Sequence, residues 1–291
     1  MSSVVHIWRG LRPKHWIKNL FVFAGILFSQ NISQLSMLLV VACAFFVFCL
    51  LSSSAYLIND IRDLEQDKHH PLKRHRPLAS GKLNVRHAIL VLGFLVPFSL
   101  GMAYLLGASF FLVACVYLLL QLAYSFALKR IVIVDSFAVA FGFMLRVVAG
   151  AVVINVEVSS WLLICTILIA LFLALTKRRR ELVILEQDAQ HHRKVLGEYT
   201  PYLLDQLIAV VTPAVLLAYT LYTMAEETAA KFGTNELVLT VPFVLYGVLR
   251  YVYLVHGKET SAGPETVLLT DVPLLIDIVL WAAAVGVILY R

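Results

Sequence analysis

Residues 45–67 read FFVFCLLSSSAYLINDIRDLEQD, an apolar run that passes directly into a group of charged side chains. The apolar part is typical of a membrane-spanning helix, and we expect this helix to continue beyond Ile58 into the cytoplasm. Asp60, Asp63 and Asp67 then occupy positions i, i+3 and i+7, within about 60° of one another around the helix axis. The sequence therefore predicts three carboxylates that face one volume at the end of a membrane span.

The composition extends this interpretation to the whole chain. Of 291 residues, 60% are hydrophobic and only 14% are charged, and the mean hydropathy is +0.85. A soluble domain of this length could not bury so much apolar surface. We therefore expect an all-α polytopic membrane protein. About nine spans are predicted, at 19–36, 37–58, 87–106, 109–128, 131–154, 161–176, 206–225, 237–255 and 273–290.

The basic residues indicate the orientation of these spans. Nearly all of the 24 Lys and Arg residues fall in alternate loops, above all in the N-terminal arm, in 59–86 and in 177–194. Because cytoplasmic loops carry the excess of Lys and Arg, the N-terminus is expected in the cytoplasm and the C-terminus on the opposite side. The formal charge of +6 follows this alternation, so we expect a bilayer and no nucleic acid as partner. The two long loops follow the second and sixth spans, as in a duplicated four-helix unit, which the sequence alone does not establish.

The carboxylates at the end of the second span suggest a metal site. Carboxylates on one helix face repel one another, and a divalent cation between them would offset the repulsion. Oxygen ligands suit Mg²⁺, which is commonly bound by one or two carboxylates together with substrate phosphates. The basic stretch 69–77 could bind the same phosphates from the other side. Two simpler alternatives remain open, namely a solvated helix end and a membrane-anchoring role for Lys73 and Arg74.

The pattern N-D-x-x-D-x-x-x-D at 59–67, with R-P-L-A-S-G at 76–81 and L-R-P-K-H-W-I-K-N at 11–19, resembles the UbiA superfamily of intramembrane prenyltransferases. The resemblance extends over the whole chain. It implies a single UbiA-like transmembrane domain over 1–291, with about nine helices around a central cavity. It also implies a cytoplasmic cap of two long loops, with Mg²⁺ holding a diphosphate beside the aspartates.

The loop after the sixth span departs from the aromatic prenyltransferases of this superfamily, which carry a second aspartate-rich motif there. Residues 177–182 instead read KRRREL. This loop, the N-terminal motif and GPETVLLTD at 263–271 are similar to the decaprenyl-phosphate phosphoribosyltransferase branch. That resemblance implies transfer of phosphoribose from phosphoribosyl diphosphate (PRPP) to a polyprenyl phosphate. Envelope sugar-lipid synthesis at the bacterial plasma membrane is the implied setting.

The resemblance and the charges together give roles to individual residues. A lipid phosphate is ionised at neutral pH, so no general base is expected. Catalysis should rest on positioning and on stabilising the departing diphosphate. We expect Asp60 and Asp67 to hold Mg²⁺ with support from Asp63 or Asn59, and Glu181 to bind a metal or orient its water. The candidate catalytic residues are Asp60, Asp63, Asp67 and Glu181, the first three as metal ligands. The candidate substrate-binding residues are Asn59, Lys14, Lys18, Arg62, Arg74, Arg76, Lys129, Arg146, Lys177, Arg178 and Tyr199.

Arg146 is notable because it lies inside the fifth predicted span. A charge at the centre of a membrane helix costs about 2.5–3.5 kcal/mol on insertion scales, so a function is expected. Asp135 precedes it by about three helical turns and should lie on the same side. We expect Arg146 to face the central cavity and to contact the lipid phosphate or the aspartate-rich helix. A purely structural ion pair is the alternative.

Two other functions remain to be separated from phosphoribosyl transfer. An aromatic prenyltransferase of the same superfamily would join an allylic diphosphate to a ring, in the synthesis of a quinone precursor. A transporter would need several ionisable residues within the spans, where Arg146 is nearly alone. The length of the lipid chain and the oligomeric state cannot be deduced from the sequence.

Overall fold

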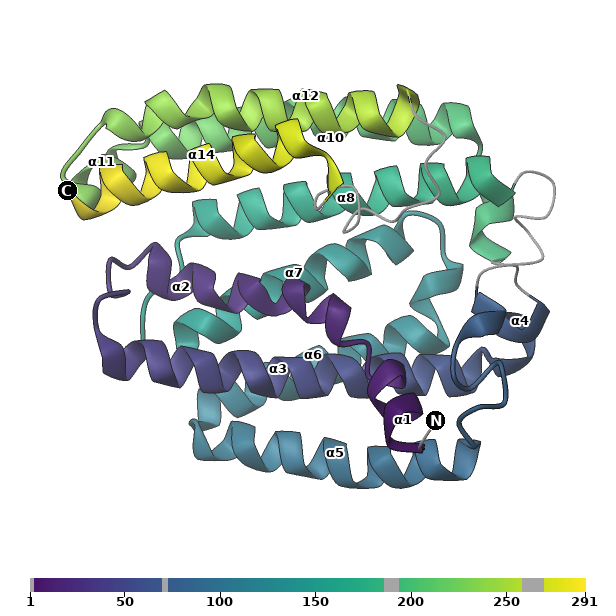
Figure 1. The fold of residues 1–291 in the computed structure, drawn as a ribbon. Coiled ribbons are helices and arrows are strands. Elements are labelled where there is room, and N and C mark those ends of the chain that lie inside the picture. The colour runs from purple at the N-terminus through teal and green to yellow at the C-terminus, as the bar shows by residue number, and fades with distance from the viewer. Residues whose placement is uncertain (1–2, 70–72, 186–193, 258–269) are drawn as a thin grey trace. The chain divides into compact units, whose positions relative to one another are not determined.

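The computed structural model describes residues 3–69, 73–185, 194–257 and 270–291, and these ranges contain helices and no strands (Figure 1). Eight helices in these ranges are long and apolar enough to cross a bilayer. Two of them include the adjoining 3₁₀ turns η3 (Leu128–Arg130) and η6 (Glu236–Thr240). The chain is thus a multi-pass membrane protein. The long helices are α3 (Leu35–Arg62), α5 (Val85–Leu105), α6 (Ala108–Phe126), α7 (Val134–Val152), α8 (Ser160–Leu185), α10 (Pro201–Met224), α12 (Val241–Gly257) and α14 (Val272–Tyr290).

The chain divides into two compact units, Met1–Val158 and Ser159–Arg291. Four of the long helices belong to the first unit (α3, α5, α6 and α7) and four to the second (α8, α10, α12 and α14). Each unit begins its set of four with its longest helix, of 28 residues in α3 and 26 in α8. This division agrees with the four-helix repeat suggested by the spacing of the long loops. The expectations of a single domain and of a central cavity stay predictions.

The first predicted span, 19–36, has other boundaries and another geometry. The chain forms a short helix α1 (Ser3–Gly10), then a 3₁₀ helix η1 (Pro13–Phe23) and one α-helical turn α2 (Ala24–Leu27). The 11 residues of η1 rise about 22 Å at 2.0 Å each, and α2 adds about 6 Å. This length is close to the ~30 Å of a bilayer core. The segment runs beside α3 in the opposite direction (Figure 1), while the count of nine spans stays a prediction.

The three-residue period of η1 decides which of its side chains contact α3. In a 3₁₀ helix residues i and i+3 lie on one face, so Trp16, Asn19 and Val22 share a face. The Nε1–H group of Trp16 donates to Ser53 Oγ at 3.0 Å. Val22 is fully buried in the apolar core. The amide of Asn19, also fully buried, binds partners on α3 that are described below.

The sixth predicted span is longer than expected, because α8 continues nine residues beyond 176 to Leu185. The apolar run ends at Thr176, but Lys, Arg, Glu and Leu are all good helix formers. The predicted second long loop therefore begins as helix. Within the first predicted long loop, 59–86, α4 (Leu64–His69) and the 3₁₀ turn η2 (Lys73–His75) also have helical structure. In unit 2, η5 (Lys194–Glu198) and α11 (Glu226–Phe232) complete the described helices.

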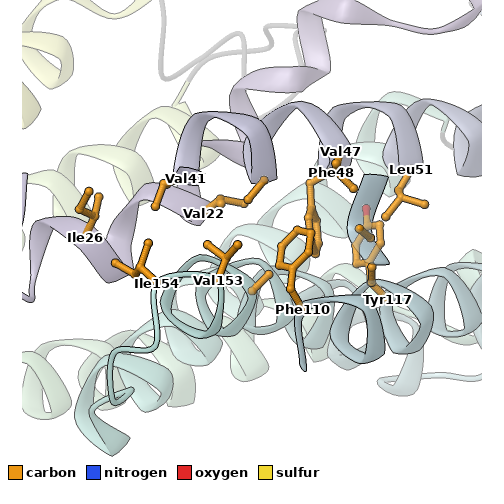
Figure 2. Close-up of a cluster of buried hydrophobic side chains, with 14 residues drawn as sticks. Val22, Ile26, Val41, Val47, Phe48, Leu51, Phe110, Tyr117, Val153 and Ile154 are labelled. Carbon is orange, nitrogen blue, oxygen red and sulfur yellow. The ribbon is translucent and has the colours of Figure 1, made fainter. Parts of the chain in front are cut away.

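The core of the first unit joins η1, α2 and α3 to α6 and α7 (Figure 2). The ring of Phe48 lies 5.9 Å from that of Phe110 and 5.0 Å from that of Tyr117. On the other side of η1, glycine permits close backbone approach: a Cβ atom on Gly150 would lie 1.7 Å from the carbonyl oxygen of Val22. Small residues at such contacts are typical of packing between membrane helices.

Replacing Gly150 by Ala should destabilise the protein by about 1–3 kcal/mol, the usual cost of overpacking, because backbone must move to admit the methyl group. Thermal unfolding in detergent measures the change. Gly93→Ala in α5 is the matched control, since no atom lies within 4 Å of its added Cβ and alanine favours the helix. Equal stability of the two variants would contradict the close contact between η1 and α7.

Candidate functional site

The predicted aspartate-rich cluster lies at the end of α3, where the helix leaves its apolar segment. α3 ends at Arg62 and α4 follows from Leu64, while the N–H group of Asp67 donates to the carbonyl oxygen of Asp63 at 2.8 Å. The expected helical extension beyond the apolar run is therefore confirmed. Three other segments of the first unit contribute cations to this cluster: the turn between α1 and η1, the stretch around η2, and η3.

Asp60 and Asp67 share one guanidinium group. Nη1 of Arg76 lies 3.0 Å from Oδ1 of Asp60 and 2.5 Å from Oδ2 of Asp67. Arg12 donates a second hydrogen bond to Asp60, and Nζ of Lys73 lies 4.0 Å from Asp67. Both carboxylates are buried, with 3% of each residue exposed. Their negative charges are thus neutralised by side chains of this chain.

Burial raises the pKa of the Asp67 carboxyl above its ordinary value, because loss of water disfavours the charged form. The nearby charges of Arg76 and Lys73 act in the opposite direction without cancelling this effect. The contacts of Asp67 with Arg76 and Lys73 thus favour its ionised form against the effect of burial on its pKa.

Asp63 forms its ion pair with a different cation, Lys129. Nζ of Lys129, in η3, lies 2.5 and 2.7 Å from the two carboxylate oxygens of Asp63 and 3.0 Å from Oδ1 of Asn59. Asn59 and Asp63 are four residues apart, so they share a helix face. The Asp63 side chain is 19% exposed, more than that of Asp60 or Asp67.

The three carboxylates therefore form two groups, one around Arg76 and one around Lys129. In the part of the chain that the structure describes, no set of three His, Cys, Asp or Glu side chains is arranged to hold a metal ion. We expected all three carboxylates to face one volume, but in the structure Asp63 binds a different cation from Asp60 and Asp67. Their assignment as metal ligands stays a prediction, with Asn59 and Asp63 as one pair and Asp60 and Asp67 as the other.

Arg12 is a site residue that the sequence analysis missed. It has left-handed backbone angles, with φ of 52° and ψ of 58°, at the turn between α1 and η1. The carbonyl oxygen of the preceding Leu11 accepts a hydrogen bond from Ser53 Oγ at 2.7 Å, and the guanidinium lies 5.0 Å from the centre of the Tyr56 ring. The available signal was Pro13, which disfavours helical backbone in the residue before it and so marks a turn at a cation.

The remaining predicted residues of the first unit have varied surroundings. The guanidinium of Arg62 lies 4.4 Å from the centre of the Phe126 ring. Arg74 is exposed, and its Nε–H group contacts His75 at 3.4 Å. Lys14 is exposed and Lys18 is partly buried. Substrate binding by these four residues stays a prediction.

Arg146 in α7 is 4% exposed and lies within the membrane helices. Its Nε–H group donates to Asn19 Oδ1 at 2.7 Å, Nη1 to the carbonyl oxygen of Gly142 at 2.8 Å, and Nη2 to the Tyr117 hydroxyl at 2.7 Å. All three partners are neutral, so this is not the ion pair considered as an alternative. The Nδ2 group of Asn19 donates to Ser52 Oγ at 3.1 Å and to Cys49 Sγ at 3.3 Å.

Arg146 thus reaches the aspartate-rich helix through Asn19 and Tyr117. Cys49 precedes Asn59 by ten residues, about 15 Å along α3 at 1.5 Å per residue. Ser52, the other partner of Asn19 on α3, precedes Asn59 by about two helical turns. The contacts favour a structural role, and binding of a substrate by Arg146 stays a prediction.

The basic run in the second unit lies on α8. Successive helical residues point about 100° apart, so Lys177, Arg178, Arg179 and Arg180 cannot all face one ligand. Arg178 pairs with Glu181 at 2.9 Å, and Arg179 pairs with Asp205 of α10 at 2.5 Å. Asp205 also contacts His256 at 3.1 Å. Tyr199 is 3% exposed. The roles predicted for Lys177, Arg178, Glu181 and Tyr199 stay predictions.

Replacing Arg146 by Leu should destabilise the protein, because Asn19 and Tyr117 lose their buried donor at a cost of about 1–3 kcal/mol each. Thermal unfolding in detergent tests this expectation. Arg62→Leu makes the same chemical change at the C-terminal end of α3, and we expect a smaller loss of stability there. If Arg146→Leu were as stable as Arg62→Leu, the structural role of Arg146 would be wrong.

The family model described as the UbiA prenyltransferase family matches residues 19–269. A decaprenyl-phosphate phosphoribosyltransferase of Corynebacterium glutamicum is 35% identical over 289 residues, covering 97% of this chain and 86% of that protein. The protein of the same name from Mycobacterium tuberculosis H37Rv is 34% identical, covering 98% of this chain and 94% of that protein.

The fold is also similar to that of a solved UbiA homologue from Archaeoglobus fulgidus bound to GPP and Mg²⁺. The TM-score is 0.72 at 18% identity, with 98% of this chain and 100% of that chain covered. This similarity confirms the predicted fold class, an all-α polytopic membrane protein. The chain belongs to the UbiA prenyltransferase family.

Proposed function

We propose that the protein transfers the 5-phosphoribosyl group of PRPP to decaprenyl phosphate, or to a related polyprenyl phosphate, and releases diphosphate. Relatives named decaprenyl-phosphate phosphoribosyltransferase, which match nearly the whole chain, support this proposal. The observation that carries it is the excess of cations at the end of α3. There, four cations face three carboxylates, namely Arg12, Lys73, Arg76 and Lys129 beside Asp60, Asp63 and Asp67.

This positive surplus suits substrates that bring several phosphate groups. PRPP carries a diphosphate and a separate 5-phosphate, and the acceptor lipid carries a phosphate of its own. Arg12, Arg76 and Lys129 have side chains that are 18%, 25% and 13% exposed. They are thus partly accessible, and charge-assisted hydrogen bonds from such groups to phosphate are strong.

The position of the site along α3 suits one lipid-soluble and one water-soluble substrate. The helix is apolar up to Ile58 and carries its charged residues from Asn59 onward. A polyprenyl chain could therefore lie against the apolar helices while its phosphate reaches the charged end. PRPP would arrive from water at the same level.

The donor set at Asn59 and Asp63 fits Mg²⁺. Three of their oxygens already surround one cation, the ammonium of Lys129, and carboxylate and amide oxygens suit Mg²⁺. Asp60 and Asp67 are more buried and already hold guanidinium groups. We therefore assign the metal first to Asn59 and Asp63, and give Asp60 and Asp67 the role of holding Arg12 and Arg76. When bound, Mg²⁺ would neutralise charge on the departing diphosphate.

The side chains of the site would bind and orient the two substrates. A phosphate monoester is ionised at neutral pH because its second pKa is about 6, so the lipid oxygen needs no general base. It attacks C1 of the ribose as the bond from C1 to the diphosphate oxygen breaks, and the diphosphate leaves with the electron pair. In-line displacement would invert the sugar from the α to the β configuration. Alignment and charge stabilisation would supply the rate enhancement.

We also propose that the site faces the cytoplasm of a bacterial cell, at the plasma membrane. The N-terminal arm and the stretch 59–86, which carry the site's cations, are the basic segments expected there. The C-terminus would then lie on the opposite side.

Labelled PRPP with a polyprenyl phosphate saturated at its α-isoprene unit tests the proposed reaction. Phosphoribosyl transfer ionises no allylic carbon, so a phosphoribosylated lipid is expected by mass spectrometry. Its formation should stop with EDTA and recover with added Mg²⁺. A parallel assay pairs an allylic diphosphate with an aromatic acid. Prenylation of the ring, without reaction of PRPP, would overturn the proposal in favour of an aromatic prenyltransferase.

Replacing Asp63 by Asn tests the metal assignment. Turnover should fall about 10²–10³-fold, as when one group that stabilises developing charge is lost. The Mg²⁺ concentration that gives half of the maximal rate should rise. Glu65→Gln is a matched control two residues away, because Glu65 is exposed and pairs with Lys68. A variant Asp63→Asn with the wild-type rate at low Mg²⁺ would exclude Asp63 as a ligand.

A further inference from the structure

Lys129 occupies the point at which the oxygens of Asn59 and Asp63 converge. Its ammonium lies within 3.0 Å of three oxygens from these two residues. We propose that Lys129 takes the position of the metal ion in the substrate-free enzyme, and that metal therefore binds together with a diphosphate group, which draws Lys129 away. This inference rests on the metal assignment in the proposed function.

The lysine and the metal would compete for the same ligands. Mg²⁺ binds oxygens at about 2.0–2.1 Å and demands near-octahedral geometry. The ammonium of Lys129 engages both oxygens of Asp63 at 2.5 and 2.7 Å. An ammonium left at that position would repel a divalent cation at contact distance and would block its approach to Asp63. Metal binding at Asp63 therefore requires Lys129 to move.

Lys129 is suited to such a movement. Its ammonium is a compact charge on a flexible four-carbon chain with rotatable donors. The side chains of Lys129 and Asp63 are 13% and 19% exposed, so the pair lies near solvent. Arg76 differs, because its guanidinium joins two carboxylates that are almost fully buried. Lys129 can exchange its partner for a phosphate oxygen, whereas Arg76 is held in place.

The charges around the site explain why the exchange would depend on diphosphate. Without metal, the four cations exceed the three carboxylates by one charge. A divalent metal alone would raise this surplus to three charges. A metal that enters with an anionic diphosphate adds no net positive charge, and the diphosphate supplies new acceptors for Lys129.

The test is the affinity of the purified full-length protein for Mn²⁺, measured by electron paramagnetic resonance. Wild-type protein should bind Mn²⁺ weakly alone and at least about tenfold more tightly with inorganic pyrophosphate, once the signal of Mn²⁺–pyrophosphate in solution is subtracted. Lys129→Met should bind Mn²⁺ at least about tenfold more tightly than wild type without pyrophosphate. Adding pyrophosphate to this variant should then produce a much smaller gain.

Two variants serve as controls. Lys129→Arg keeps the charge and should bind Mn²⁺ weakly, as wild type does. Lys68→Met removes the same charge nearby, but Lys68 contacts Glu65 at 2.6 Å, so its Mn²⁺ affinity should equal that of wild type. If Lys129→Met binds Mn²⁺ no more tightly than wild type, the inference is wrong. Should that variant not fold, wild-type affinity that does not change with pyrophosphate would also overturn it.

Failure of the inference can be separated from failure of the proposed function. The measurement uses neither PRPP nor lipid, so it does not depend on the identity of the substrates. Adding Asp63→Asn to Lys129→Met should abolish the tight Mn²⁺ binding. If Asp63→Asn changes Mn²⁺ binding in neither background, the metal assignment itself is wrong. If Asp63→Asn weakens Mn²⁺ binding while Lys129→Met leaves it unchanged, only the inference on Lys129 fails.

Discussion

The hydrogen bonds of Asn19 are the constraint on which the first unit depends. A polar group inside a bilayer must find its partners within the protein, and the amide of Asn19 is fully buried. Its oxygen accepts from Arg146 of α7, and its nitrogen donates to Ser52 and Cys49 of α3. Asn19 therefore fixes η1 between two membrane helices and gives the intramembrane charge of Arg146 a neutral, hydrogen-bonded environment.

The geometry of the candidate site follows from this junction. η1 begins where the chain turns at Arg12, and Arg12 binds Asp60 at the far end of the same face of α3. Between these points, Trp16 binds Ser53 one 3₁₀ turn from Asn19. The position of η1 along α3 thus sets the distance between Arg12 and Asp60. The cluster around Asn19 and Arg146 and the cluster around Asp60, though separate, are linked through one 3₁₀ helix.

The sequence predicts the site's acids better than its cations, for a physical reason. The aspartates lie within eight residues at the end of α3 and in α4, so local helical geometry brings them near one another, and the expected continuation of helix beyond Ile58 is confirmed. Their division between Arg76 and Lys129 depends on tertiary contacts. Arg12 and Lys129 lie 48 and 66 residues from the carboxylates they bind, and only tertiary packing brings them there. The bounds predicted for the first span, 19–36, differ from those of η1 and α2, because an apolar run alone does not reveal a 3₁₀ helix. A period of three, through Trp16, Asn19 and Val22, was the available signal.

The two groups of carboxylates differ in the cation that neutralises them, and this difference has chemical consequences. A guanidinium offers a planar set of donors and can join two carboxylates at once, as Arg76 does with Asp60 and Asp67. Removing it would take the shared cation from two buried carboxylates, which is costly, and would leave Asp60 with Arg12 alone and Asp67 with Lys73 alone. An ammonium is a point charge that can turn toward other acceptors, and Lys129 binds the more exposed Asp63. The group of Arg76, Asp60 and Asp67 therefore suits a permanent structural role. The pair of Lys129 and Asp63 suits a place where a metal and a phosphate could replace the ion pair during turnover.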